Sequence, residues 1–189
     1  MSLMNLLMKR RSIRKYTKDK IDEAIIKKIL QAGMLVPSSR AIYPLEYIVV
    51  RDPEILCQLA NAKNSGSEML QSADTAIVVI GNTEKSDAWI EDASISMTNM
   101  MLEATELGIG NCWVQCRGRV SREKIKTNGV ETKNSSNTNL DTDSYLRKLL
   151  GYPKNYSAEA MLSLGIPAVK PSPHTLSDLK KEKIHQEHY

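Results

Sequence analysis

The sequence contains no phenylalanine, and only 5% of its 189 residues are aromatic. It also lacks an apolar run of membrane-spanning length, and the positive charges near its start follow the apolar stretch 1–8, the reverse of a secretory signal. We therefore expect a cytoplasmic protein that does not enter a membrane. The remaining composition, 41% apolar and 25% charged, is ordinary for a globular protein and predicts one domain over residues 1–189.

Histidine and cysteine are also scarce. All three histidines lie near the C-terminus, so the core of the chain has no histidine base, which argues against a Ser-His-Asp hydrolase. The three cysteines, Cys57, Cys112 and Cys116, lack the paired spacing of a zinc site, and we expect no metal. We interpret them as buried apolar residues in a reducing compartment, with a redox dithiol at 112 and 116 as the alternative.

Hydrophobic periodicity predicts an alternation of helices and strands. The expected helices cover residues 3–9, a segment capped by Asp22 and extending to Gly33, a segment beginning at Pro53, residues 88–107, a turn or more at 121–126, and 145–150. The expected strands cover residues 45–50, 75–80, 112–115 and 161–164. The strand at 75–80 is apolar on both faces, which indicates a central position in the sheet. The methionines of the helix at 88–107 indicate core packing, and this helix should be buried on most sides.

Two segments lack the periodicity of a packed element. Residues 127–143 are polar and predict a surface loop or lid. The chain from about residue 170 is rich in proline, lysine and histidine, and it is either disordered or an arm that follows a partner surface.

Positive charge is concentrated at the two ends of the chain, although the formal net charge is only +4. Near the N-terminus, three arginines and a serine fall within five residues, just where a helix gives way to extended chain. Guanidinium groups form bidentate bonds with phosphate oxygens, so the cluster suits a phosphomonoester. The alternatives are a solvated basic edge or a loose nucleic-acid patch.

Four segments together resemble the nitroreductase family in order and spacing. They are RRSIRKY near the N-terminus, PSSRAIYPLEYIVV at 37–50, EDASISMTNMMLEATELGIGNCWVQ at 91–115, and the final KEKIHQEHY. The segment at 37–50 most resembles family members with an xxYPLE sequence. The resemblance implies a three-layer α+β fold, with a central mixed sheet flanked by helices, and an intertwined homodimer that binds two FMN molecules at its interface.

The resemblance also implies which residues hold the phosphate and ribityl chain of FMN. At the N-terminus these are Arg10, Arg11, Ser12 and Arg14. The family usually adds a basic residue close to the C-terminus, for which Lys183 is the best match and Lys181 the second.

Two further segments would contact the flavin ring. The family likeness implies that Pro37, Ser38 and Ser39 reach a flavin bound mainly by the other subunit, although proline and serine also suit an ordinary helix-ending turn. Gln115 and Cys116 are candidates for backbone contacts at the flavin N5 atom. No catalytic side chain is expected, because the flavin carries the redox chemistry itself.

The sequence departs from the family pattern at three places. An asparagine common in the family is Ala41 here, and an aromatic residue after the later proline is Leu45, with Tyr43 between them. Glu68 stands where a basic residue is often found. These changes affect the choice of substrate more than the choice of cofactor.

The function implied is an oxidoreductase that uses NADH or NADPH. It would pass electrons through FMN to a small nitro compound, quinone, enone or flavin by a ping-pong mechanism. A non-catalytic flavin-binding protein is the first alternative. A basic nucleic-acid-binding module is the second, and we expect no nucleic-acid partner.

Overall fold

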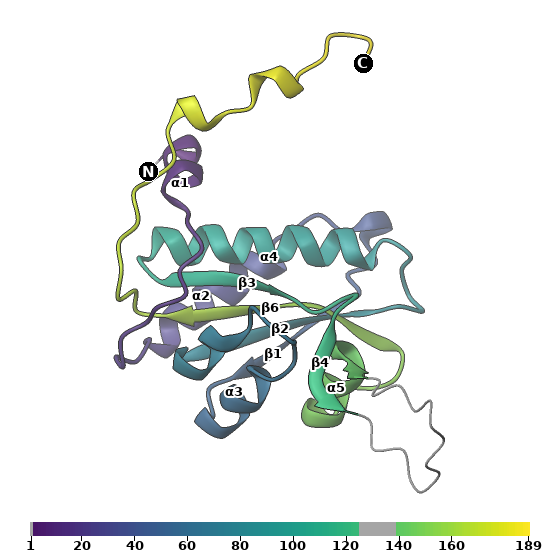
Figure 1. Ribbon diagram of the computed structural model, residues 1–189. Coiled ribbons are helices and arrows are strands. Elements are labelled where there is room, and N and C mark those ends of the chain that lie inside the picture. The colour runs from purple at the N-terminus through teal and green to yellow at the C-terminus, as the bar shows by residue number, and fades with distance from the viewer. Residues whose placement is uncertain (1, 125–138) are drawn as a thin grey trace, which may run out of the picture.

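The computed structural model of the protein describes residues 2–124 and 139–189, which adopt a three-layer α+β fold (Figure 1). The central sheet has the strand order β1-β2-β6-β3, and each neighbouring pair is antiparallel. Its strands are β1 (Leu45–Val50), β2 (Thr75–Asn82), β6 (Tyr156–Gly165) and β3 (Gly110–Gln115). A separate two-stranded sheet pairs β4 (Val120–Lys124) with β5 (Asn139–Asp141).

Five α-helices accompany these strands within the described part of the chain. They are α1 (Leu3–Lys9), α2 (Glu23–Met34), α3 (Pro53–Leu59), α4 (Trp89–Glu106) and α5 (Thr142–Leu150). Short 3₁₀ turns occur at η1 (Ser39–Ala41), η2 (Glu68–Ser72), η3 (Leu176–Asp178) and η4 (Lys181–Lys183). The predicted cap is confirmed, since the Asp22 side chain accepts a hydrogen bond from the Ala24 N–H at the start of α2. None of these helices is long and apolar enough to cross a bilayer.

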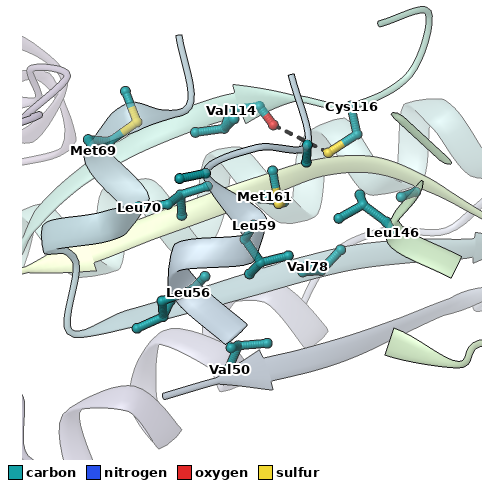
Figure 2. Packing of buried hydrophobic residues seen from close by; sticks show 14 of the residues in the cluster. Val50, Leu56, Leu59, Met69, Leu70, Val78, Val114, Cys116, Leu146 and Met161 are labelled. Carbon is teal, nitrogen blue, oxygen red and sulfur yellow. Dashed lines mark hydrogen bonds between the residues drawn. The ribbon is translucent and has the colours of Figure 1, made fainter. Parts of the chain in front are cut away.

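Strand β2 shows why the sheet is covered on both faces. All eight of its residues are buried, as the continuous apolar run predicted, and their side chains alternate between two hydrophobic clusters. Ile77 and Val79 pack with α2 and α4, whereas Val78 packs with α3, η2 and α5. Figure 2 shows this second cluster, in which Leu59 and Met161 lie beside Val78.

Helices α2 and α4 approach each other closely on the first face. A Cβ atom at Gly33 of α2 would lie 2.7 Å from Cγ of Met100 on α4, so only glycine fits there. The same point is tied by hydrogen bonds, because the Ser96 hydroxyl and the Tyr47 hydroxyl each donate to the Gly33 carbonyl at 2.8 Å. These contacts fix the C-terminal end of α2, just before the segment 37–39, against α4.

Both ends of the chain run along the same edge of the sheet. Ser12 forms a parallel bridge with Asn111 of β3, which is the parallel component of the otherwise antiparallel arrangement. Tyr16 forms an antiparallel bridge with Pro167, just beyond β6. From there the C-terminal segment passes α1, and its last part extends away from the sheet (Figure 1).

Several sequence expectations are wrong in detail. Residues 121–124 belong to strand β4 and not to a helical turn, while 125 and 126 lie outside the described residues. Strand β6 begins at Tyr156, five residues before the expected start, and α5 begins at Thr142. The polar stretch 127–143 is therefore not a loop at its end, since 139–143 form β5 and the start of α5; residues 127–138 lie outside the described part. Cys57 is exposed, unlike the other two cysteines.

Candidate functional site

The extended segment after α1 divides the arginine cluster between two faces. The Ile13 N–H donates to the Asn111 carbonyl at 2.8 Å, which holds the segment beside β3. Side chains of an extended chain alternate in direction. Arg10, Ser12 and Arg14 accordingly lie on the face of Cys112, while Ile13 is buried on the opposite face.

The environment of Cys112 defines a cationic surface. Burial raises the pKa of this thiol, and the positive charges of Arg14, Lys63 and Arg10 oppose that rise, as does a hydrogen bond from Ser12. Three positive charges and the Ser12 hydroxyl thus all affect one buried sulfur atom. Arg14 and Ser12 are exposed and Arg10 and Lys63 are half-buried, so their polar ends remain open to a ligand. We call these four residues the cationic cradle.

Lys63 was not identified from the sequence. It lies in the turn between α3 and η2 and lines a pocket of about 390 Å³ together with Asn64, Ser65, Gly118, Arg119 and Val120. A single lysine in a polar connection carries no periodic or motif signal. Only the folded chain shows that it joins residues from the N-terminus.

Arg11 points to the opposite face from Arg10, Ser12 and Arg14. Its predicted contact with the FMN phosphate or ribityl chain stays a prediction. Its guanidinium donates a hydrogen bond to the Ser172 carbonyl in the C-terminal segment. It also lines a groove of about 670 Å³ whose walls are mainly apolar. Arg11 therefore fastens the C-terminal segment to the body of the protein.

The segment at 37–39 forms the base of a constrained loop. The Ser38 hydroxyl donates to Oδ2 of Asp92 at 2.6 Å, and the Ser39 N–H donates to Oδ1 of the same carboxylate at 3.2 Å. Asp92 is only 4% exposed and lies in the first turn of α4. Pro37 is exposed, and Ser38 and Ser39 are half-buried.

The loop and the cradle lie at opposite ends of α4. The loop contacts Asp92, whereas Thr105 of α4 accepts a hydrogen bond from Asn111, the residue paired with the N-terminal segment. With a rise of 1.5 Å per residue, these helix positions are about 20 Å apart. Within one chain, the two candidate regions are therefore well separated.

Gln115 and Cys116 are engaged in contacts within the chain. The Gln115 side chain accepts a hydrogen bond from Nε1 of Trp113 at 2.8 Å and donates to the buried Glu159 carboxylate at 3.0 Å. The Cys116 N–H donates to the Glu159 carbonyl at 3.0 Å. The backbone contacts of Gln115 and Cys116 with the flavin N5 atom stay a prediction. Arg117 completes the group by an ion pair with Glu159 at 2.9 Å.

Cys112 of β3 and Cys116, the residue that follows β3, are unsuited to redox chemistry with each other. Cys112 and Cys116 lie four residues apart on an extended chain, which separates their Cα atoms by about 13 Å, far beyond the reach of a disulfide. Burial also raises the pKa of the Cys116 thiol strongly, so the thiol stays protonated. The interpretation of these two residues as buried fillers is confirmed.

The C-terminal lysines lie on a different part of the molecule. Lys181 and Lys183 belong to η4, both are exposed, and the segment that carries η4 projects beyond α1 (Figure 1). Exposed apolar side chains occur both on this segment and on α1: Leu3, Met4, Leu7, Leu176, Leu179 and Ile184. In residues 2–124 and 139–189, no group of three or more His, Cys, Asp or Glu side chains is arranged to hold a metal.

Comparison with known proteins identifies relatives over nearly the whole chain. The model of the family described as the nitroreductase family matches residues 7–66 and 56–166. A protein of Archaeoglobus fulgidus, provisionally named NADH dehydrogenase/NAD(P)H nitroreductase, is 34% identical over 189 residues, covering 97% of each chain. The solved structure of an FMN-dependent nitroreductase from Clostridium difficile R20291 is similar with a TM-score of 0.87 and 37% identity, covering 99% of this chain and 100% of the other.

Proposed function

Because this chain belongs to the nitroreductase family, we propose that it is an FMN-dependent oxidoreductase that takes electrons from NADH or NADPH and passes them to a small organic acceptor. The acceptor would be a nitro compound, a quinone, an enone or a flavin. A cytoplasmic location is part of the same proposal. The two relatives support it through their names, which specify FMN for one and NAD(P)H for the other.

The cationic cradle is the observation that carries the proposal. A phosphomonoester is close to a dianion at neutral pH and offers three acceptor oxygens. Arg10, Arg14, Lys63 and Ser12 supply two guanidinium groups, one ammonium group and one hydroxyl. Their three positive charges are enough to neutralise the dianion, and they provide at least one donor for each oxygen. The donor set therefore fits the phosphate and ribityl end of FMN.

A homodimer would complete the site. Ser38 and Ser39 lie near the opposite end of α4 from the cradle, so a second subunit can supply the loop to a ring held by the first. The exposed apolar side chains of α1 and the C-terminal segment support the same proposal, because a partner would cover them. In this arrangement, Lys181 or Lys183 would reach the phosphate group of an FMN molecule only when the C-terminal segment lies along the partner subunit.

The residues of the chain have binding and positioning roles in this proposal. When bound, FMN supplies the redox chemistry by accepting two electrons from the nicotinamide and donating them to the acceptor. The cradle fixes the phosphate, and Glu159 holds the end of β3 through Gln115 and Arg117. The buried Cys116 thiol stays protonated and takes no part as a nucleophile. One exposed ring face would serve donor and acceptor in turn.

The test begins with the visible spectrum of the purified protein supplied with FMN. We expect a bound-flavin spectrum, loss of the yellow colour on anaerobic mixing with NADH or NADPH, and recovery when an acceptor such as a quinone is added. Initial rates with both substrates varied should give parallel double-reciprocal lines. Bound FMN that neither nucleotide reduces would identify a flavin-binding protein without this activity.

A second outcome would exclude a role for flavin. Failure to bind FMN, together with salt-dependent binding to DNA or RNA, would favour the nucleic-acid alternative. Intersecting double-reciprocal lines would still be consistent with an oxidoreductase. They would contradict the proposal that the electron donor and the acceptor use the same face of the flavin ring in turn.

A further inference from the structure

We propose that Asp92 is the positioning residue of the acceptor side of the site, and that it acts by holding the loop 38–43 in one conformation. The inference rests on the proposed function, in which this loop lies against a flavin bound by the partner subunit. Asp92 was not singled out by the sequence, where it is one acidic residue within a helix.

Asp92 is placed to control the loop at its base. It lies in the first turn of α4, is 4% exposed, and uses both carboxylate oxygens on two consecutive residues, Ser38 and Ser39. Ser38 passes the constraint along the loop, because its hydroxyl oxygen accepts the Tyr43 N–H at 2.9 Å. One buried carboxylate thereby fixes both ends of the loop.

The loop needs such a constraint because its backbone is strained. Arg40, Ala41 and Tyr43 all have left-handed backbone angles, with φ of 54°, 54° and 50°. Residues with a Cβ atom avoid this region unless the surrounding structure holds them there. The 3₁₀ hydrogen bond from the Ala41 N–H to the Ser38 carbonyl, at 3.0 Å, follows from that conformation.

The contacts also determine which groups of the loop can face a ligand. The Ser38 hydroxyl donates to Asp92 and accepts from Tyr43, so its only donor is used within the chain. Tyr43 is 63% exposed, although it is aromatic and its backbone is strained. The loop held by Asp92 therefore offers the exposed Tyr43 ring to a planar acceptor.

The experiment compares Asp92→Asn and Ser38→Ala with the wild-type dimer loaded with FMN. Asparagine has nearly the shape of aspartate, but it has only one acceptor oxygen, so it cannot accept hydrogen bonds from both the Ser38 hydroxyl and the Ser39 N–H. Misplacing a positioning group by about 1 Å can reduce a rate by up to 100-fold, so we expect a fall of between about 10- and 100-fold in kcat/KM for a quinone acceptor. FMN affinity should change much less, because the cradle is untouched.

Two further variants separate positioning from stability. Ser96→Ala removes a buried hydroxyl one turn further along α4, bonded to Gly33, and should lower the melting temperature without a comparable fall in kcat/KM. The double variant D92N/S38A should lose no more activity than the worse single variant, because both changes break the same contact.

The outcomes distinguish this inference from the proposed function. If the wild type binds no FMN or has no NAD(P)H-dependent activity, the proposed function fails. If the wild type is active, and D92N and S38A keep their kcat/KM or lose only what S96A loses, the assignment of Asp92 is overturned. Should D92N fail to fold, S38A alone decides the matter.

Discussion

The segment at residues 10–16 and the loop at residues 38–43 present polar groups to solvent by different means. The first is held through its backbone, by bridges to β3 and to the chain beyond β6, and Ile13 anchors it in the core. The second depends on two side-chain hydrogen bonds to Asp92 and contains three residues in left-handed conformations. The first region should therefore tolerate changes in its exposed side chains, whereas the second should respond to the loss of one buried carboxylate.

The comparison also suggests a division of labour. Backbone pairing spaces side chains at fixed intervals, which suits a phosphate that must be bound in one place. A strained loop can place an aromatic ring and a main-chain segment where no regular element would. If the two regions have the proposed roles, cofactor affinity and substrate choice should respond to different substitutions.

The largest expected effect concerns the cradle. Arg10→Ala and Arg14→Ala should each weaken FMN binding by about 1 to 3 kcal/mol, the range for a charge-assisted hydrogen bond. Because loss of the exposed Arg14 or the half-buried Arg10 side chain leaves the backbone pairing intact, the melting temperature of the flavin-free protein should change little. Fluorescence titration with FMN measures the affinity.

Arg11→Ala is the matched control for these variants. It removes the same charge from the neighbouring position, but from the opposite face, where the guanidinium binds the Ser172 carbonyl. FMN affinity reduced as much by R11A as by R10A would contradict the separation of the two faces.

The next effect tests how rigidly the first segment is packed. A Cβ atom at Gly165 would lie 2.5 Å from Cγ of Tyr16, so Gly165→Ala forces the tyrosine ring to move. Overpacking of this kind typically costs about 1 to 3 kcal/mol of unfolding free energy. Urea denaturation measures this loss of stability.

Ser177→Ala, in the exposed C-terminal segment, is the control. Gly118→Ala is a poor control because the φ angle of Gly118 is positive. Equal stability of G165A and S177A would show that Tyr16 moves aside at little cost.

Truncation after Val169 should have a moderate effect on the dimer. It removes Leu176, Leu179 and Ile184, which are all exposed in the single chain, and the lysines of η4. We expect the dissociation constant of the dimer, measured by sedimentation velocity, to increase. FMN binding should weaken by about 1 kcal/mol, the upper range for an exposed charge.

Lys183→Ala separates the two contributions of this segment, because it removes one charge and leaves the apolar side chains. A truncated protein that is still a tight, FMN-bound dimer would exclude a role for the segment in either property.

The smallest effect is the pH dependence contributed by Asp74, which anchors the chain between the two regions. Burial alone would raise the pKa of this carboxyl group, but hydrogen bonds from Thr75, the Ile21 N–H and Lys20, with the charge of Arg51, lower it overall from 3.8. A lowered pKa means that the folded state binds the proton less readily than the unfolded state. The stabilisation is thus present above pH 3.8 and is lost as the pH falls below it.

Asp74→Asn should therefore reduce stability near pH 7 and flatten the decline in stability that the wild type shows as the pH falls below 3.8. Unfolding free energies measured by urea denaturation across that range check this. A decline as steep in the variant as in the wild type would assign the acid sensitivity to other carboxyl groups.

Most of the fold could be predicted from periodic apolar residues, and the errors have physical reasons. Strand β4 was expected to be helical because SREK carries no apolar alternation; it is defined by pairing with β5. The early start of β6 was hidden by Glu159, a charged residue that is buried because Arg117 and Gln115 satisfy it. A sequence pattern contains no information about such partners.

The candidate site was predictable to the extent that its residues are adjacent in sequence. Arg10, Ser12 and Arg14 formed a visible cluster, but the alternation that separates Arg11 from them required a defined extended conformation. Lys63 and Asp92 are single charged residues in unremarkable surroundings, and they acquire a role only through folding. The lysines of η4 remain a prediction, because in the single chain their segment extends away from the cradle.

The pairing of the two chain ends has a consequence for biosynthesis. Residues 12–16 leave the ribosome early, yet one of their partners, Pro167, lies more than 150 residues further along the chain. Long-range closure of this kind delays folding, because the entropy of a large loop must be lost before the contact forms. The basic N-terminal segment therefore stays unpaired with the chain beyond β6 until residue 167 has been synthesised. If this segment binds FMN as proposed, capture of the cofactor should follow that step.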